Sequence, residues 1–206
     1  SGKGINSDGL SINWADLMKH KHGFTDPVPQ SMEDGLTRSG VTTLHGRARF
    51  TGPRQLEIDG TVYDADRLLV ATGARPRPLE FPGHQHLIDS TDFLDLEELP
   101  SRILFVGGGF ISFEFAHIAA RAGSAATIID RGERPLKGFD PDLVELLVDH
   151  GREVGIDLRR RTSVVNLHQS DTGYRVALEH DGAQETIETD LVVHGAGRVA
   201  DLADLG

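Results

Sequence analysis

Three adjacent glycines stand where an apolar run gives way to a helical pattern, in the segment ILFVGGGFISFE at residues 103–114. Glycine costs about 0.5–1 kcal/mol relative to alanine inside regular structure, so three in a row indicate that something approaches the main chain closely. Gly107, Gly109 and Ser112 have the spacing G-x-G-x-x-G/A, in which the first glycine permits a tight turn and the second lets a pyrophosphate touch the backbone. The third position lets helix and strand pack closely. Serine stands there in this chain, and its hydroxyl can bond back to a carbonyl one turn earlier.

The helix predicted after the glycines supplies the electrostatics of an anion site. Its first turn offers free N–H groups and a partial positive charge of about half a unit. A dinucleotide is therefore expected at Gly107–Ser112, a loop that also contains Gly108, Phe110 and Ile111. The glycine spacing alone is a weak signal, but here a strand precedes it, a helix follows it, and an acid ends the next strand. The alternative is a tight strand–helix turn that binds no ligand.

The acid that ends the next predicted strand is Asp130, about 20 residues beyond the glycines. A carboxylate at this place accepts hydrogen bonds from the adenosine ribose and repels a 2′-phosphate, which favours NAD. Arg131, Arg134 and Lys137 follow at once, and such cations can bind the 2′-phosphate of NADP. The sequence favours NAD and leaves NADP open. A solvated loop of mixed charge is the alternative for the cations.

The elements around these residues alternate between strand and helix. Strands are predicted at 103–106, 124–130 and 191–197, and helices at 110–122, ended by Gly123, and at 139–155, with Asp140 as N-cap. Residues 156–169 are expected to be extended, and two further strands separated by Asp181–Gly182 complete an antiparallel meander. The predicted fold class is α/β: a Rossmann-like parallel sheet with right-handed crossovers and helices on both faces, plus the meander.

The first 85 residues have a different character. A helix broken near Pro27 and Pro29 is predicted, followed by short strands within 41–50 and 55–72 with a hairpin turn at Asp59–Gly60. Residues 73–83 are rich in proline, glycine and arginine, which is typical of a linker or a crossing between domains. We therefore expect two domains, one at 1–85 and a nucleotide-binding domain at 86–206.

Composition narrows the function classes. The chain has 206 residues, a formal net charge of -11, ten histidines and no cysteine. The acidic balance argues against nucleic acid as a partner, and no apolar run is long enough to span a membrane. SGKGINSDGL has no apolar stretch of a secretory signal, so a cytoplasmic location is expected. The histidines are scattered without metal-ligand spacing, so no metal site is predicted.

Four segments in a fixed order give a resemblance to a known family, the pyridine nucleotide–disulfide oxidoreductases. They are LLVATGARPRP at 68–78, ILFVGGGFISFEFAHIAARAGS at 103–124, RPLKGFDPDL at 134–143 and LVVHGAGRVADL at 191–202. They resemble the segment leaving the flavin domain, the nicotinamide-domain glycine loop, the stretch after its second strand, and its closing strand. The closing strand normally reads A-x-G-R-x-P-N, whereas here Gly195 replaces the alanine and Ala200–Asp201 replace Pro-Asn.

The resemblance implies roles for particular residues. Phe110 matches a gating residue over the flavin, with core packing as its alternative. Glu114 matches an acid near the nicotinamide amide that pairs with a lysine outside this chain, with an exposed or capping glutamate as its alternative. Two backbone segments also match the family. The segment near the nicotinamide cofactor is Gly195, Ala196, Gly197 and Arg198, and the segment near the flavin is Ala71, Thr72 and Gly73.

The implied activity is hydride transfer from NAD(P)H to FAD and on to a disulfide or another acceptor. The family's FAD fingerprint, redox cysteines and dimerisation domain are not in this chain. It resembles the central piece of a chain of about 450 residues, in which residues 1–85 would be a partial flavin-domain segment. The parent is expected to be a homodimer, and the piece alone is expected to bind nucleotide without turnover. Two alternatives are an NADH oxidase or ferredoxin-reductase relative without redox cysteines, and a non-catalytic dinucleotide sensor.

Overall fold

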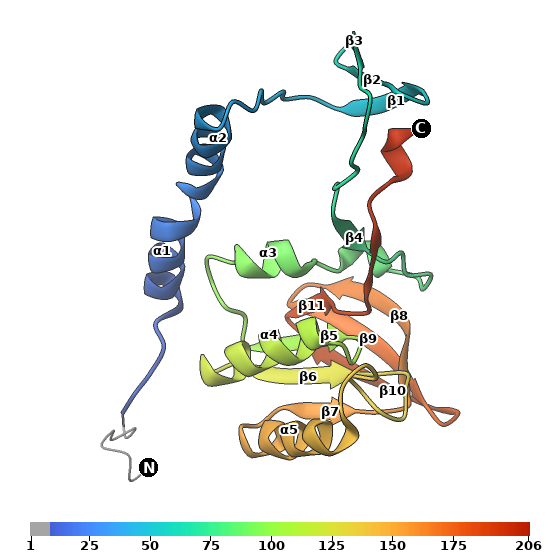
Figure 1. Ribbon diagram of the computed structural model, residues 1–206. Coiled ribbons are helices and arrows are strands. Elements are labelled where there is room, and N and C mark those ends of the chain that lie inside the picture. The colour runs from blue at the N-terminus through green and yellow to red at the C-terminus, as the bar shows by residue number, and fades with distance from the viewer. Residues whose placement is uncertain (1–8) are drawn as a thin grey trace. The chain divides into compact units, whose positions relative to one another are not determined.

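A computed structural model describes residues 9–206, and the chain forms two compact units (Figure 1). The first unit comprises the described residues up to Lys19 together with Pro76–Gly197, and the second comprises His20–Arg75 with Arg198–Gly206. The expectation about a secretory signal concerns residues 1–10, which lie outside the described residues except for Gly9 and Leu10.

The first unit is built on a four-stranded parallel sheet. Its strands are β5 (Arg102–Val106), β6 (Ala125–Ile129), β7 (Asp157–Arg159) and β11 (Leu191–His194), in the order β11-β5-β6-β7. Every neighbouring pair is parallel. The predicted α/β class and parallel sheet are therefore confirmed, and β5, which carries the glycines, lies in the interior of the sheet.

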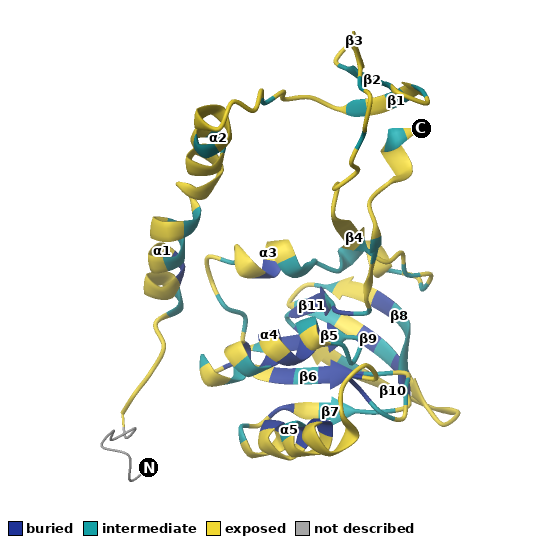
Figure 2. Cartoon of the chain, viewed as in Figure 1, coloured by how far each residue is buried: buried dark blue, intermediate teal, exposed yellow. Residues whose placement is uncertain are grey.

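Helices cover one face of this sheet. They are α3 (Ser90–Leu94), α4 (Phe110–Arg121) and α5 (Pro141–Glu153), after a short 3-10 turn η1 (His84–His86). Ile103 and Phe105 of β5 point into the core beneath them, where Phe93 stacks on Phe115 at a ring-centroid distance of 4.5 Å. Figure 2 shows the buried residues concentrated in β5, β6 and the inner side of α4.

The antiparallel meander covers the other face. It consists of β8 (Thr162–Ser170), β9 (Gly173–His180) and β10 (Ala183–Thr189) in the order β10-β9-β8. Leu104 and Val192 of the parallel sheet pack with Val176 and Leu178 of the meander in a second buried cluster. Helices were predicted on both faces of the sheet. The meander covers this face instead, because its own apolar side needs burial.

The helix termini follow local rules. Asp140 caps α5 by accepting hydrogen bonds from the backbone N–H groups of Asp142 and Leu143 at 2.9 and 3.3 Å, with Pro141 as the first helical residue. Gly123, after α4, has φ +102°, in the left-handed region that glycine adopts without strain. The predicted meander turn is also present, with positive φ at Asp181 and Gly182.

The second unit contains small elements. Helix α1 (Trp14–Thr25) begins in the first unit's residues, and α2 (Val28–Arg38) follows the predicted break at Pro27. The other elements are β1 (Ala48–Gly52), β2 (Gln55–Ile58), β3 (Thr61–Asp64), β4 (Ala74–Pro76), β12 (Arg198–Ala200) and the 3-10 turn η2 (Ala203–Leu205). The predicted hairpin between β2 and β3 is present at Asp59–Gly60.

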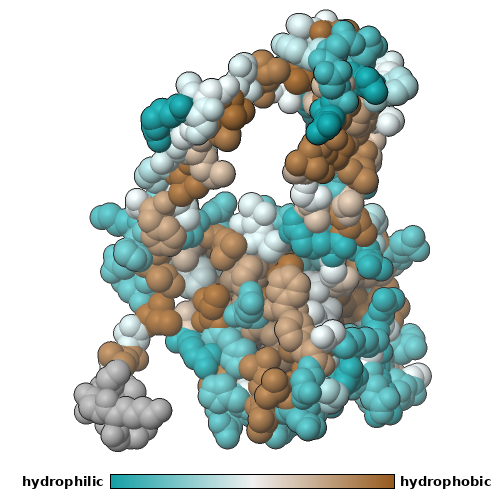
Figure 3. All heavy atoms as spheres, viewed as in Figure 1, coloured by the Kyte–Doolittle hydropathy of each residue, from teal (hydrophilic) through white to brown (hydrophobic). Residues whose placement is uncertain are grey.

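Two stretches of the predicted strands in this unit are wrong. Residues 41–47 and 65–72 form no strand, although both carry apolar residues suited to one. A strand needs a neighbour to pair its backbone groups, and neither stretch pairs with another strand in the described part of the chain. Leu69 is accordingly 92% exposed. Figure 3 shows hydrophobic residues at the surface of this unit.

Candidate dinucleotide site

The glycine loop leaves β5 at the carboxyl edge of the parallel sheet and is held by both neighbouring strands. The N–H of Gly107 donates to the carbonyl oxygen of Ile129 at the end of β6, at 2.8 Å. On the other side, the N–H of Gly195 donates to the carbonyl oxygen of Val106, also at 2.8 Å. The loop therefore lies where ligands bind in open parallel sheets, outside the carboxyl ends of the strands.

The three glycines are bare for different reasons. Gly107 has φ +110°, and a Cβ there would lie 2.5 Å from the Cα of Ala196. A Cβ on Gly108 would lie 2.5 Å from Oδ2 of Asp130. Gly109 is less crowded than the other two, but a Cβ there would still lie 3.2 Å from the carbonyl oxygen of Gly195, which is a tight contact. Protein neighbours therefore account for the first two glycines and restrict the third less severely.

The first turn of α4 carries free backbone donors. Gly109 is the N-cap residue, with extended backbone (φ −90°, ψ 174°) and no side chain to cap the helix. Phe113 is the first residue whose N–H bonds within the helix, to the carbonyl oxygen of Gly109 at 3.2 Å. The N–H groups of Phe110, Ile111 and Ser112 therefore have no helical acceptor, which leaves them suited to an anion.

Asp130 lies directly beside this loop, as its position at the end of β6 predicts. Its Oδ1 accepts a hydrogen bond from the N–H of Gly132 at 3.2 Å, while its Oδ2 faces Gly108. The amine of Lys137 lies on the same side of Gly132 as this carboxylate, because the amine and Oδ2 of Asp130 would each be 3.2 Å from a Cβ on Gly132. Arg131 is exposed to solvent. The carboxylate and both candidate cations therefore belong to one short loop.

Leu136 anchors that loop, and no sequence signal pointed to it. Its N–H donates to the carbonyl oxygen of Gly108 at 2.8 Å, and its side chain is buried. Its φ is +49°, a conformation that non-glycine residues seldom adopt. Leu136 thus joins the 131–138 segment to the glycine loop and holds Asp130 between them.

The end of β11 forms the other wall. The carbonyl oxygen of Gly195 lies beside Gly107 and Gly109, and Ala196 touches Gly107, so these matched residues do meet the glycine loop. Ser112 is fully buried against the same strand end, and its hydroxyl has no hydrogen-bond partner in the described structure. The bond back to a carbonyl that the sequence allowed is absent.

Arg77 and His194 join this wall and were missed by sequence reasoning. The N–H of Arg77 donates to the carbonyl oxygen of Gly197 at 3.0 Å, and Nε2 of His194 donates to the carbonyl oxygen of Arg77 at 2.8 Å. The guanidinium of Arg77 lies 3.7 Å from where a Cβ on Gly197 would stand. Arg77 and His194 are 117 positions apart, so no local pattern could associate them.

Phe110 and Glu114 lie one helical turn apart on the solvent side of α4. Phe110 is 54% exposed, which contradicts the alternative that it packs in the core. Glu114 is exposed in the second turn and does not cap the helix, because Gly109 is the N-cap. Both side chains are therefore available to a ligand or to another part of the protein.

The matched flavin-side residues lie in the second unit. The hydroxyl of Thr72 donates to the carbonyl oxygen of Asp201 at 2.6 Å, and the N–H of Asp201 donates to the carbonyl oxygen of Gly73 at 3.1 Å. Arg198 donates to the carbonyl oxygen of Ala74. These bonds hold the A-T-G segment beside β12.

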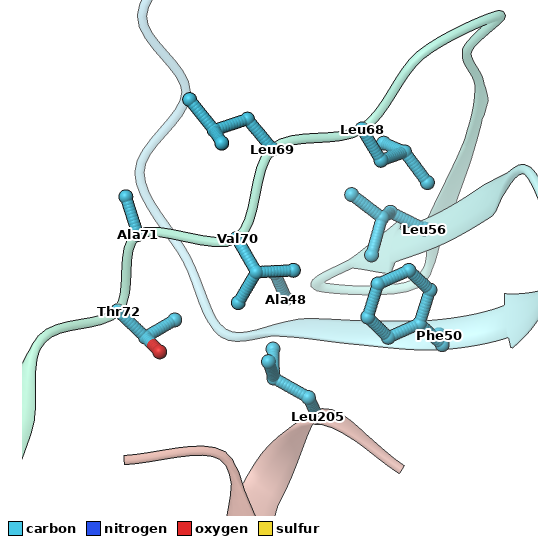
Figure 4. A pocket seen from close by; sticks show the side chains of 9 residues that line it. All are labelled: Ala48, Phe50, Leu56, Leu68, Leu69, Val70, Ala71, Thr72 and Leu205. Carbon is cyan, nitrogen blue, oxygen red and sulfur yellow. The ribbon is translucent and has the colours of Figure 1, made fainter. Parts of the chain in front are cut away.

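An apolar pocket of about 210 Å³ lies next to this segment (Figure 4). Leu68 and Val70 point toward Phe50, whereas Leu69 points away. The side chains alternate as in a strand, although residues 65–72 pair with no strand in the described part of the chain. The lining residues are Ala48, Phe50, Leu56, Leu68, Leu69, Val70, Ala71, Thr72 and Leu205.

Among residues 9–206, no three histidine, aspartate or glutamate side chains gather as metal ligands would. In the same part of the chain, every helix is too short or too polar to cross a bilayer.

Comparisons with known proteins agree with the geometry. The family described as pyridine nucleotide-disulphide oxidoreductase matches residues 12–205. A dihydrolipoyl dehydrogenase of Thermus scotoductus is 33% identical over 204 residues, covering 95% of this chain and 44% of the relative. A glutathione reductase of Burkholderia cepacia is 32% identical over 206 residues, covering 100% of this chain and 45% of the relative. The chain thus spans less than half the length of the curated relatives it matches.

A solved structure shares the fold. The HOCl-induced flavoprotein disulfide reductase RclA from Escherichia coli superposes with a TM-score of 0.84, at 23% identity, over 94% of this chain and 45% of its own. The family match spans both units and contains the glycine loop, Asp130 and the end of β11. The chain therefore belongs to the pyridine nucleotide-disulphide oxidoreductase family.

Proposed function

We propose that this chain is the NAD(P)H-binding part of a FAD-dependent oxidoreductase. The observation that carries the proposal is the uncapped first turn of α4, whose free N–H groups lie beside the glycine loop at the carboxyl edge of the parallel sheet. An anion of the size of a pyrophosphate is the natural partner for such donors. When bound, NAD(P)H supplies a hydride and FAD accepts it, while the protein supplies binding, orientation and electrostatics.

Each residue near the loop has a proposed task. Gly107–Ser112 bind the pyrophosphate through their backbone, and Asp130 accepts from the adenosine ribose. NAD is favoured because Asp130 already stands against the loop, where it would repel a 2′-phosphate. Arg131 and Lys137 are the groups that would bind a 2′-phosphate if NADP is used instead.

The remaining proposed tasks follow the family resemblance. Phe110 covers the flavin face, and Glu114 lies near the nicotinamide amide; their shared exposed side of α4 supports this. Gly195–Arg198 lie along the nicotinamide cofactor, and Ala71–Gly73 are main chain near the flavin. Residues 1–85 form part of the flavin domain, and residues 86–206 form the nucleotide domain.

The whole protein, in this proposal, passes the hydride from FAD to a disulfide or another acceptor and works as a homodimer. The relatives named dihydrolipoyl dehydrogenase and glutathione reductase support a disulfide as the acceptor. The described residues include neither a nucleophile at the site nor a cysteine, so the chain alone should bind nucleotide without turning it over.

The proposal is tested by placing a fixed negative charge at the anion site. Aspartate is a preferred N-cap, so the carboxylate of Gly109→Asp should occupy the free N–H groups, and its capping bonds should offset the tight 3.2 Å contact of its Cβ with the carbonyl oxygen of Gly195. We expect the dissociation constant for NADH, measured by calorimetry, to rise at least about tenfold, which is about 1.4 kcal/mol.

The matched control is Gly138→Asp, the same change in the same unit at a position with open space around it. It should leave both the melting temperature and NADH affinity unchanged. Undiminished NADH binding by a folded Gly109→Asp protein would refute the proposed site, and a wild-type chain that binds neither NADH nor NADPH would refute the proposed function.

A further inference from the structure

Ser112 is a polar side chain buried without a partner at the centre of the proposed site. It is 0% exposed, and its Oγ makes no hydrogen bond within the described residues. A buried hydroxyl without a partner is destabilising, so neither exposure nor hydrogen bonding accounts for serine here. The hydroxyl does have one close neighbour across the loop, which is Gly195.

Gly195 is bare because of Ser112. A Cβ on Gly195 would lie 1.9 Å from Oγ of Ser112 and 3.2 Å from its Cβ. The φ of Gly195 is not in the left-handed region, so its backbone conformation does not require glycine. Of the atoms near that Cβ, the Ser112 hydroxyl is the only one nearer than 3.0 Å. The hydroxyl thus occupies the volume that a side chain at residue 195 would need.

The same residue touches the glycine loop at two other points. The carbonyl oxygen of Gly195 lies 2.6 Å from where a Cβ on Gly107 would stand and 3.2 Å from the corresponding position on Gly109. A shift of Gly195 away from Ser112 would therefore alter both walls of the site. The separation between the first turn of α4 and the end of β11 depends on how Ser112 and Gly195 fit together.

We propose that Ser112 and Gly195 form a complementary pair that positions the two walls of the nucleotide site. Neither side chain touches the ligand; the serine fills the space that the glycine leaves, and the pair sets the width of the site. The steric part stands on the contacts alone. Its consequence for NADH rests on the proposed function.

A double-mutant cycle on the full chain tests the pair, with thermal unfolding and NADH calorimetry as readouts. Gly195→Ala should lower the melting temperature by roughly 4–8 °C, because the methyl overlaps the hydroxyl. It should also weaken NADH by at least about fivefold, since hydrogen bonds to a phosphate are sensitive to small displacements of the donors. Ser112→Ala alone should unfold at the same or a higher temperature, because it removes the unpartnered hydroxyl.

Two double variants should recover the losses of stability and NADH affinity to different degrees, which a general loss of structure would not reproduce. Ser112→Ala combined with Gly195→Ala should recover part of both losses, because two Cβ atoms 3.2 Å apart remain tight. Ser112→Gly combined with Gly195→Ala should recover most of both. Should Gly195→Ala alone fail to fold, the folding of this last double variant is itself the test.

Gly151→Ala is the matched control. This buried helical glycine of α5 has its nearest neighbour at 3.7 Å, an ordinary contact, so the methyl should be tolerated whatever stands at residue 112. Strictly additive effects of Gly195→Ala and Ser112→Gly would overturn the pairing. Thermal rescue without recovery of NADH binding would overturn its positioning role, and thermal rescue in a chain that never bound NADH would instead overturn the proposed function.

Discussion

At the scale of single residues, Asp130 connects the structure to the choice of cofactor. Its carboxylate is held between Gly108 and the N–H of Gly132, so its position is set before any ligand arrives. Leu136 fixes the same loop through its bond to Gly108. A carboxylate held in place can discriminate between a ribose hydroxyl and a phosphate, because it accepts from one and repels the other.

We predict that Asp130→Ala weakens NADH several-fold and leaves NADPH less affected, because the ribose loses its acceptor and the 2′-phosphate loses a repelling charge. Arg131→Ala should have the opposite pattern and weaken NADPH. Parallel titrations with both dinucleotides measure the two ratios. Equal effects of each variant on both cofactors would contradict the roles assigned here.

At the scale of elements, α4 and α5 are joined by a polar network on the helix-covered side of the sheet. The rings of His117 and His150 stack at 5.9 Å, and Arg121 donates to Nδ1 of His117 at 2.8 Å and to Nε2 of His150 at 3.1 Å. Nδ1 of His150 lies 3.3 Å from a carboxylate oxygen of Glu153. One guanidinium therefore contacts both rings, and a ring nitrogen that accepts its hydrogen bond carries no proton in that arrangement.

This network makes the stability of the first unit pH-dependent. Burial first, then the charge of Arg121, and then that of His150 when its ring is protonated, lower the pKa of His117 below its usual 6.5. The unfolded chain therefore takes up a proton at a higher pH than the folded chain does. The stabilisation is fully present above about pH 6.5 and is lost as the pH falls toward the lowered folded pKa.

We predict that His117→Gln flattens the decline in melting temperature between about pH 7 and pH 5, because the residue that resists protonation is removed. Thermal unfolding at a series of pH values measures it. His20→Gln, at an exposed position in α1, is the control and should keep the wild-type profile. An unchanged acid slope in His117→Gln would exclude His117 as its source.

At the scale of the whole molecule, the chain consists of two units with unequal cores. The large apolar clusters belong to the first unit, in which Trp14 packs edge-on against Phe93 at 6.2 Å and donates to the carbonyl oxygen of Leu96 at 2.6 Å. The second unit exposes Leu69, Met32 and Phe24 by 92%, 64% and 60%. The proposed nucleotide site, apart from Arg198 and the flavin-side residues, lies within the first unit.

We predict that residues 76–197 fold without the rest of the chain and bind NADH within about twofold of the full-length affinity, because a domain with its own core keeps its site. Their melting temperature should be lower, since Trp14 is missing. Circular dichroism and calorimetry on the shortened chain measure both quantities. Non-cooperative unfolding would show that residues outside 76–197 are needed for this part of the chain to fold.

Local patterns sufficed for most elements of the first unit. The strand before Gly107, the helix ended by Gly123, the cap at Asp140 and the turn at Asp181–Gly182 depend on neighbours in sequence, and the structure confirms them. The predicted strands do not extend over 41–47 and 65–72, because a strand forms only beside a partner strand, and a short stretch of sequence does not show whether one is present. The prediction of helices on both sheet faces was wrong for the same reason, because the position of the meander depends on contacts between residues far apart in the sequence.

For the site, the sequence by itself determined the loop that could receive a phosphate, because a strand, glycines and a helix start are contiguous. Only the tertiary structure decided how much room each glycine has: Ala196 bounds Gly107, Asp130 bounds Gly108, and the carbonyl oxygen of Gly195 bounds Gly109 less closely. It also brought Arg77 to Gly197 and the hydroxyl of Ser112 to Gly195. These contacts join residues far apart in the chain, and excluded volume between such residues has no signature in either segment alone.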